Sequence, residues 1–180
     1  MDQRVKLIRS CEWEEVFLSW FQGEGDSQKW LNIVKEKGFA SWADWRLKCY
    51  AKRFECAKAT WGLYEVSEPC AVVSTWFGGP FQGWIKNRYQ GKKTSNFLEL
   101  ADQEEVKNHR DVQAIIKNYP ETKMIIALET KDGKIFVIEG MHRSCALGIM
   151  EKNGLSCPKK LVFAIGKSDF SELPVFESMA

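Results

Sequence analysis

Two short hydrophobic runs in the second half of the chain predict a pair of β-strands. Residues 124–130 and 135–139 are rich in β-branched and aromatic side chains, and an Asp-Gly pair lies in the polar segment 131–134 between them. Such a segment is typical of a hairpin turn, so the two runs are expected to pair as antiparallel strands. From Gly140 onward the hydrophobic positions recur at helical spacing, which predicts a helix that ends near Gly154.

The first turn of this predicted helix holds the clearest candidate chemistry of the chain. A helix N-terminus carries unpaired N–H groups and a partial positive charge, and it therefore favours an anion. His142 and Arg143 lie in that turn, directly after Glu139 and Gly140. Two arrangements are open: Arg143 pairs with Glu139 or another acid nearby, or an anion binds between the arginine and the helix. A phosphate group would satisfy both the arginine and the helix.

The first part of the chain predicts three short helices. Behind Ser10, hydrophobic residues recur at the spacing of one helix face: Trp13, Val16, Phe17, Trp20 and Phe21. A second helix is expected between Ser27 and Gly38. A third is expected after Ser41, which opens a segment resembling a capping box.

The tryptophans divide the chain, because all eight lie between Trp13 and Trp84. This distribution predicts two packing units, a Trp-rich helical region at 1–78 and a second unit at 79–180. The aromatic density has two interpretations. It forms a core and a domain interface, or it forms a stacking platform for bases or a partner surface.

The remaining patterns predict a sheet with covering helices. Residues 63–66 and 71–77 are β-like, 102–118 has one hydrophobic helix face with His109 near it, and 160–165 predicts a last strand. The tail at 169–180 is expected to form a short helix or an ordered cover. Together these elements predict the α+β class, with a small mixed sheet and covering helices.

The segment 84–93 interleaves cations with aromatic residues and contains no acid. Its basic residues, Lys92 and Lys93 among them, suit contacts with phosphates, and the alternative is an ordinary solvated loop. We expect this loop to face the same side of the sheet as Arg143. The formal net charge of the chain is only +2, which excludes a protein that coats DNA through a global positive field. Nucleic acid is therefore a less favoured partner, restricted to a local patch.

The six cysteines form no CxxC pair, and only two histidines, His109 and His142, are present, so no metal-ligand spacing is recognised. The cysteines are expected to be reduced and mostly buried thiols. No hydrophobic run approaches the ~20 residues that span a bilayer, and the N-terminus lacks the apolar core of a signal peptide. These features predict a cytoplasmic protein without a membrane partner; they leave its oligomeric state open.

One part of the chain, over about residues 83–167, contains a strand, the turn Glu139-Gly140-Met141-His142-Arg143, a helix and a last strand. This part of the chain resembles the core of the ParB/sulfiredoxin-like superfamily. In that superfamily a Gly-x-His-Arg turn holds nucleotide phosphates. The resemblance therefore implies a phosphate site at this turn. Sulfiredoxins carry a nucleophilic cysteine directly before the histidine, whereas this chain has Met141, whose thioether has no ionisable proton. Sulfiredoxin chemistry is not expected.

The resemblance implies a nucleotide, ATP or ADP with Mg²⁺, as the ligand. The expected cofactor-binding residues are Gly140, Met141, His142, Arg143, Ser144, Lys92 and Lys93, with Glu139 and His142 as candidate catalytic residues. The chain would then be a phosphotransferase or phosphohydrolase that acts on a small-molecule acceptor. The alternatives are a non-enzymatic, nucleotide-dependent module of the ParB type that binds DNA or a partner, and a scaffold that has lost its nucleotide.

Overall fold

The predicted hairpin is present in the computed structural model, which describes residues 2–25 and 27–177. Strands β4 (Ile125–Glu129) and β5 (Ile135–Glu139) pair antiparallel. Gly133 lies in the turn between them with a φ of +78°, a conformation that glycine adopts without steric cost. The prediction for both strands and their turn is confirmed.

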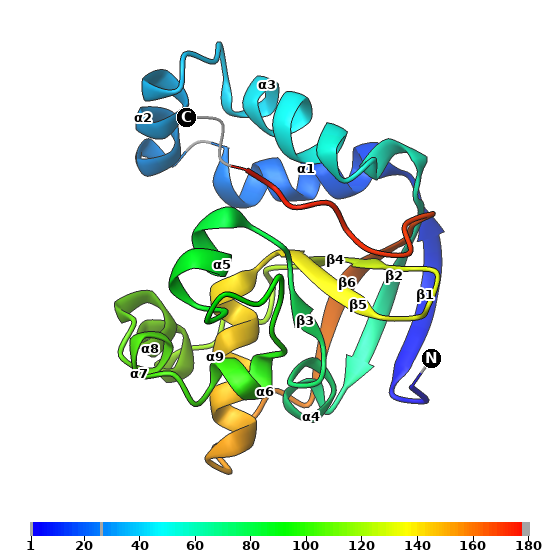
Figure 1. The fold of residues 1–180 in the computed structure, drawn as a ribbon. Coiled ribbons are helices and arrows are strands. Elements are labelled where there is room, and N and C mark those ends of the chain that lie inside the picture. Colours follow the sequence, from blue (N-terminus) through cyan, green and yellow to red (C-terminus); the bar gives the residue numbers. More distant parts are fainter. Residues whose placement is uncertain (1, 26, 178–180) are drawn as a thin grey trace.

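The described strands form one open mixed sheet, in the order β1-β2-β6-β4-β5-β3 (Figure 1). The other strands are β1 (Val5–Cys11), β2 (Thr60–Ser67), β3 (Phe77–Gly78) and β6 (Lys160–Lys167). Strand β6 pairs antiparallel with β2 and parallel with β4, and β3 pairs parallel with β5. The α+β class is therefore correct, and strands from both sides of residue 78 share the sheet.

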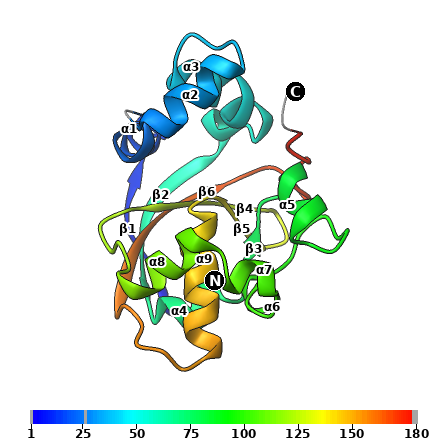
Figure 2. The same cartoon turned by 90° about the vertical axis from the view of Figure 1, so that its left-hand side faces the viewer.

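Helices lie on both sides of the sheet (Figure 2). On one side are α1 (Trp13–Glu24), α2 (Gln28–Glu36) and α3 (Trp42–Arg46), which continues into a π-helical turn at Leu47–Ala51, with a 3₁₀ turn at Cys56–Lys58. The other side carries α4 (Pro69–Val73), α6 (Phe97–Leu100), α7 (Glu104–Lys107), α8 (Arg110–Lys117) and α9 (Met141–Lys152). Helix α5 (Gln82–Asn87) lies near the edge formed by β3.

Helix α9 is the centre of the second helical layer. It packs against α4, α6 and α8, and its side chains from Cys145 to Leu147 are fully buried. Gly148 lies so close to α6 that a Cβ atom there would stand 2.4 Å from the carbonyl oxygen of Phe97. The predicted helix from Gly140 to Gly154 is confirmed, and the close packing of its middle turns fixes its position beside the sheet.

Several predictions for the first half of the chain are confirmed. Helix α2 ends before Gly38, which has a φ of +73°. At the start of α3 the hydroxyl of Ser41 accepts a hydrogen bond from the backbone N–H of Asp44 at 3.0 Å. The predicted helix with Trp13 and Val16 is also present as α1, but it does not start directly behind Ser10: this residue belongs to β1, and α1 begins after Glu12. Most of β1 is exposed at the edge of the sheet, so it has no buried face that a pattern could reveal.

Two further elements differ from the sequence prediction. Residues 71–77 were expected to be a strand, but Pro69 starts helix α4 and only Phe77–Gly78 are extended, because proline fits the first turn of a helix. The single helix expected at 102–118 is broken at His109. There the ring nitrogen Nδ1 accepts a hydrogen bond from the backbone N–H of Asp111 at 3.2 Å and caps α8.

The tail forms an ordered cover as far as residue 177, whereas residues 178–180 lie outside the described part of the chain. Phe176 packs against Tyr50, with ring centroids 4.2 Å apart, and its backbone pairs with Phe81. The tail thereby joins the Trp-rich helices to α5. Phe176 also lines the space between them.

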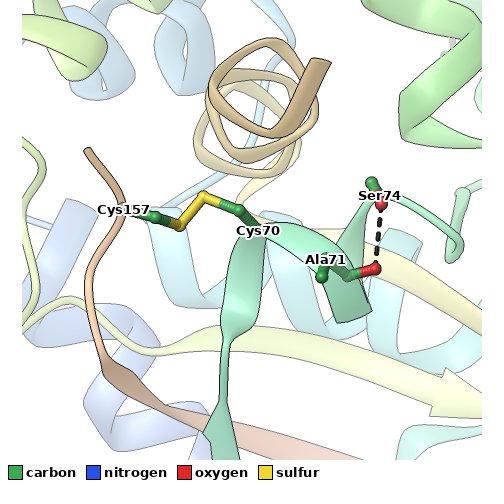
Figure 3. Close-up of a disulfide and its surroundings, with 4 residues drawn as sticks. All are labelled: Cys70, Ala71, Ser74 and Cys157. Carbon is green, nitrogen blue, oxygen red and sulfur yellow. Dashed lines mark hydrogen bonds between the residues drawn. A yellow bond between two sulfur atoms is a disulfide. The ribbon is translucent and has the colours of Figure 1, made fainter. Parts of the chain in front are cut away.

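The prediction that all cysteines are reduced is wrong for two of them. Cys70 at the start of α4 and Cys157 before β6 form a disulfide, with their Cα atoms 6.2 Å apart (Figure 3). The bond joins residues 87 positions apart in the sequence, so no local spacing indicates it. The free thiols among the described residues are Cys11, Cys49, Cys56 and Cys145.

Candidate functional site

A cleft of about 860 Å³ lies between the Trp-rich helices and the start of α9. One wall is aromatic and is formed by Trp20, Trp30, Trp45, Tyr50, Phe81, Trp84 and Phe176. The floor is the segment from Ile138 to Arg143, and α8 with the loop after it supplies Asp111, Ile115 and Lys123. The cleft therefore combines planar apolar surfaces with a charged floor, as small-molecule sites commonly do.

The floor is built by the sharp turn at Gly140. Its φ of +93° is the left-handed conformation, and a Cβ atom there would stand 2.8 Å from the side chain of Ile125. Only glycine fits this turn, which joins β5 directly to α9. Gly140 has no side chain to cap the helix, and the first turn of α9 contains no acidic residue. The N-terminus of α9 therefore opens into the cleft with its positive potential uncompensated from within the helix.

Arg143 pairs with Glu139 across this turn, which is the first of the two arrangements that the sequence left open. Nη2 of Arg143 donates to Oε2 of Glu139, and both side chains are largely buried, with exposed fractions of 10% and 14%. Burial raises the pKa of Glu139, and the positive charge of Arg143 offsets only part of that effect. The guanidinium thus lies beside the helix N-terminus with a carboxylate as its present partner.

His142 packs near two other rings. Its ring centroid lies 4.4 Å from that of His109, in a stacked arrangement, and 5.7 Å from that of Trp84. Asp111 lies nearby, and the three candidate ligand atoms of His109, Asp111 and His142 all fall within 4.8 Å of one another.

The structure brings only part of the predicted set together. Met141 lines the cleft beside Gly140 and His142, while Ser144 is fully buried and its hydroxyl has no hydrogen-bond partner among the described residues. Lys92 and Lys93 are not among the described residues that line the cleft. They pair instead with Glu99 at 3.4 Å and Glu172 at 2.8 Å. Part of the predicted basic loop is helix α5, which turns Trp84 toward the cleft.

Arg46 is a cleft residue that the sequence prediction missed. Its side chain is buried and donates to Glu24 at 2.8 Å. The guanidinium carbon lies 4.3 to 5.5 Å from the ring centroids of five aromatic residues, Trp20, Trp30, Trp42, Trp45 and Tyr50. The signal was present in the sequence, because Arg46 lies between Trp42 and Tyr50 at helical spacing on an otherwise aromatic face.

The two ion pairs influence each other across the cleft. Glu24 raises the pKa of Glu139 and Arg46 lowers it, after the larger effects of burial and Arg143. Charges from α1 and α3 on one side therefore act on the β5–α9 turn on the other. The site is a joint product of the Trp-rich helices and the hairpin with its following helix.

Comparison with protein-family models, with curated proteins and with solved structures gives no match for this chain. No described helix is long and apolar enough to cross a membrane. The resemblance to the ParB/sulfiredoxin-like superfamily consequently stays a prediction that rests on the Gly140-Met141-His142-Arg143 turn.

Proposed function

We propose that the cleft binds a nucleotide such as ATP or ADP, with its phosphates at the start of α9. One observation carries the proposal: the N-terminus of a 12-residue helix, without a capping side chain or an acid in its first turn, opens into a cleft beside a buried arginine. Backbone N–H groups and the helix dipole attract phosphate oxygens, and Arg143 adds a planar, charged donor.

The aromatic wall supports a ligand with a planar group. Trp30 and Trp84 line the cleft and are only partly buried, and a flat aromatic face can stack on any nucleobase. The volume of about 860 Å³ lies within the range common for small-molecule sites. A phosphate at one end and a base at the other suit this division of the cleft.

In this proposal the carboxylate of Glu139 occupies the position beside Arg143 that a phosphate would otherwise take. The carboxylate meets Arg143 when no ligand is bound, and a phosphate must share or replace that contact. A phosphate replaces Glu139 more easily when Glu139 is protonated. Burial raises the pKa of Glu139 and so favours the protonated form. The Glu139–Arg143 pair would then set the affinity of the site as well as stabilise the fold.

Phosphoryl transfer is a second candidate, supported by the position of Glu139 next to the proposed phosphate seat. A carboxylate with a raised pKa suits general base catalysis, because it can accept the proton of an attacking hydroxyl group. The acceptor would be a small molecule bound along the aromatic wall. ADP formation from ATP, measured for the wild type and for Glu139→Gln, tests this candidate, and equal rates in the two proteins would reject Glu139 as the base.

Calorimetric titration with ATP, ADP, adenosine and pyrophosphate, each with and without Mg²⁺, tests the binding proposal. We expect ATP and ADP to bind, adenosine to bind more weakly, and pyrophosphate to compete with ATP. A ligand at about 100 times its dissociation constant should stabilise the fold by roughly 2.7 kcal/mol, which a thermal unfolding experiment detects. Binding of none of the four would reject the proposal.

A matched control is available at Arg9, an exposed arginine that pairs with Glu15; neither is among the described residues that line the cleft. Arg9→Lys and Arg143→Lys make the same chemical change in an exposed and a buried pair. The proposal requires that only Arg143→Lys weakens the binding of ATP.

A further inference from the structure

We propose that His109, Asp111 and His142 form a binding site for a transition-metal ion such as Zn²⁺ at the edge of the cleft. The three side chains come from the starts of two helices, since His109 caps α8, Asp111 lies in its first turn, and His142 lies in the first turn of α9. They are the one group of at least three candidate metal ligands that converges in the described part of the chain. Their half-buried position leaves a path for an ion to enter.

The distances are close to those of a bound ion. All three ligand atoms lie within 4.8 Å of one another. Around tetrahedral Zn²⁺, with metal–ligand distances of about 2.0–2.1 Å, donor atoms lie roughly 3.4 Å apart. The side chains must therefore draw together by about 1.4 Å at most, which rotation about side-chain bonds can supply.

The donor set selects the class of metal. Two imidazoles and one carboxylate suit Zn²⁺, Co²⁺ and similar ions, whereas Mg²⁺ prefers oxygen ligands alone. The N-termini of α8 and α9 disfavour a bare cation, so direct bonds from imidazole nitrogens and the charge of Asp111 must hold it. Asp111 and His142 also line the cleft, so the free coordination position faces the space where a water molecule or a ligand oxygen can bind.

Metal binding has a structural consequence at His109. A neutral imidazole carries one proton on its two nitrogens, and Nδ1 of His109 now accepts a hydrogen bond from the N–H of Asp111. If Nε2 binds the metal, the ring proton moves to Nδ1, which can then no longer accept the hydrogen bond from Asp111. If Nδ1 binds the metal, its lone pair is used for the metal and is not available for that hydrogen bond. In both cases the cap of α8 is lost, and the stacked rings of His109 and His142 must turn apart to point at one ion.

The test uses the full chain without a histidine tag, stripped of metal, and titrated with ZnCl₂ or CoCl₂ alone. The chain has only two histidines, so the imidazole signals in an NMR spectrum belong to His109 and His142. We expect one equivalent of Zn²⁺ to shift the signals of both rings and of the Asp111 amide. Cobalt should give visible absorption without a thiolate charge-transfer band, which separates this site from the free cysteines.

Variants define the ligands. His109→Ala and His142→Ala should each weaken Zn²⁺ binding by more than about tenfold, a loss that even outer-shell changes can cause, and Asp111→Asn should weaken it about tenfold. Glu104→Gln, on the neighbouring helix α7, is the control and should bind as the wild type does. The proposal is overturned if one equivalent of Zn²⁺ leaves either imidazole unchanged, or if the variants bind Zn²⁺ as tightly as the control. Because no nucleotide is present, the result is independent of the proposed nucleotide site.

Discussion

Arg46 and Arg143 are both buried arginines paired with a glutamate at the same cleft, but their surroundings differ. Five aromatic rings surround the guanidinium of Arg46, and its partner Glu24 comes from another helix. Arg143 pairs with Glu139 across one local turn, directly beside the uncapped start of α9. Arg46 is held in place by the faces of the surrounding aromatic rings, and a ligand can bind without displacing them. Arg143 adds its positive charge to a helix N-terminus that already favours an anion.

We therefore expect Arg46 and Arg143 to have different roles on the two sides of the cleft. Arg46 ties α1, α2 and α3 together and so stabilises the aromatic wall. Arg143 and Glu139 form an ion pair that, in the proposed function, a phosphate would disturb. Identical substitutions at the two arginines should therefore have different effects, on stability at one site and on ligand affinity at the other.

The largest effect is expected for Arg46→Ala. Removal of Arg46 leaves the carboxylate of Glu24, whose side chain is only 17% exposed, without the cation that pairs with it, and also takes away the cation that the rings enclose. Loss of a buried pair in this way costs about 3–5 kcal/mol of the free energy of unfolding. Urea unfolding followed by tryptophan fluorescence measures this change. If Arg46→Ala does not fold, Arg46→Lys provides the measurement, and a cost equal to that of Arg9→Lys would refute the structural role.

Arg143→Lys should weaken ATP binding by a factor of about 30, although the charge is kept. The lysine loses the planar pair of donors, and the loss of charge-assisted hydrogen bonds in a partly desolvated site is on the order of 2 kcal/mol. Calorimetry on this variant, on Arg9→Lys and on the wild type gives the comparison. Equal affinity in all three proteins would show that the phosphate does not contact the guanidinium group of Arg143.

Glu139→Gln should strengthen ATP binding by about tenfold, which corresponds to roughly 1.4 kcal/mol. The amide retains a hydrogen-bond acceptor for Arg143 but removes the negative charge that competes with a phosphate. In the wild type the affinity should rise as the pH falls toward the raised pKa of Glu139, above its usual 4.5, because protonation has the same effect as the substitution.

The ratio of the two dissociation constants isolates this effect of Glu139. The ligand's own titration enters both measurements equally and cancels in the ratio. We expect the advantage of Glu139→Gln over the wild type to shrink as the pH is lowered. A ratio that is constant with pH would mean that the charge of Glu139 does not compete with the ligand.

The smallest effect is expected for the double change Lys92→Glu and Lys93→Glu. Both lysines pair with exposed acids and neither is among the described residues that line the cleft, so only long-range electrostatics connects them to the ligand. ATP affinity should fall by less than about threefold at low salt and not at all at high salt. A larger loss of ATP affinity that persists at high salt would show that Lys92 and Lys93 contact the ligand, as the sequence predicted.

The sequence predicted best where local signals decide the structure. The Asp-Gly turn, the glycine at position 140 and the change of period after it define β4, β5 and α9, and the Glu139–Arg143 contact follows from the closeness of the two residues on either side of the turn. Features that depend on distant contacts were missed. The aromatic enclosure of Arg46 needs three helices to meet, and the disulfide of Cys70 joins segments far apart in the sequence.

Other errors arose where a local signal was weak or ambiguous. Strand β1 is mostly exposed at an edge, so its hydrophobic pattern is poor. The run after Pro69 contains β-branched residues, yet the proline begins a helix there. The break at His109 depends on an imidazole acting as a helix cap, a role more common for serine, threonine, asparagine and aspartate.

The position of β6 has a consequence for the synthesis of the protein. This strand is the last of the sheet in chain order, yet it lies between β2 and β4 and joins the two halves of the sheet. On the ribosome, the β4–β5 hairpin can form as soon as it emerges, but β2 and β4 keep unpaired edges until residue 167 has been released. Such long-range pairing slows folding and leaves hydrophobic strands open to wrong partners. A nascent chain of this protein should therefore be a substrate for chaperones until β6 inserts.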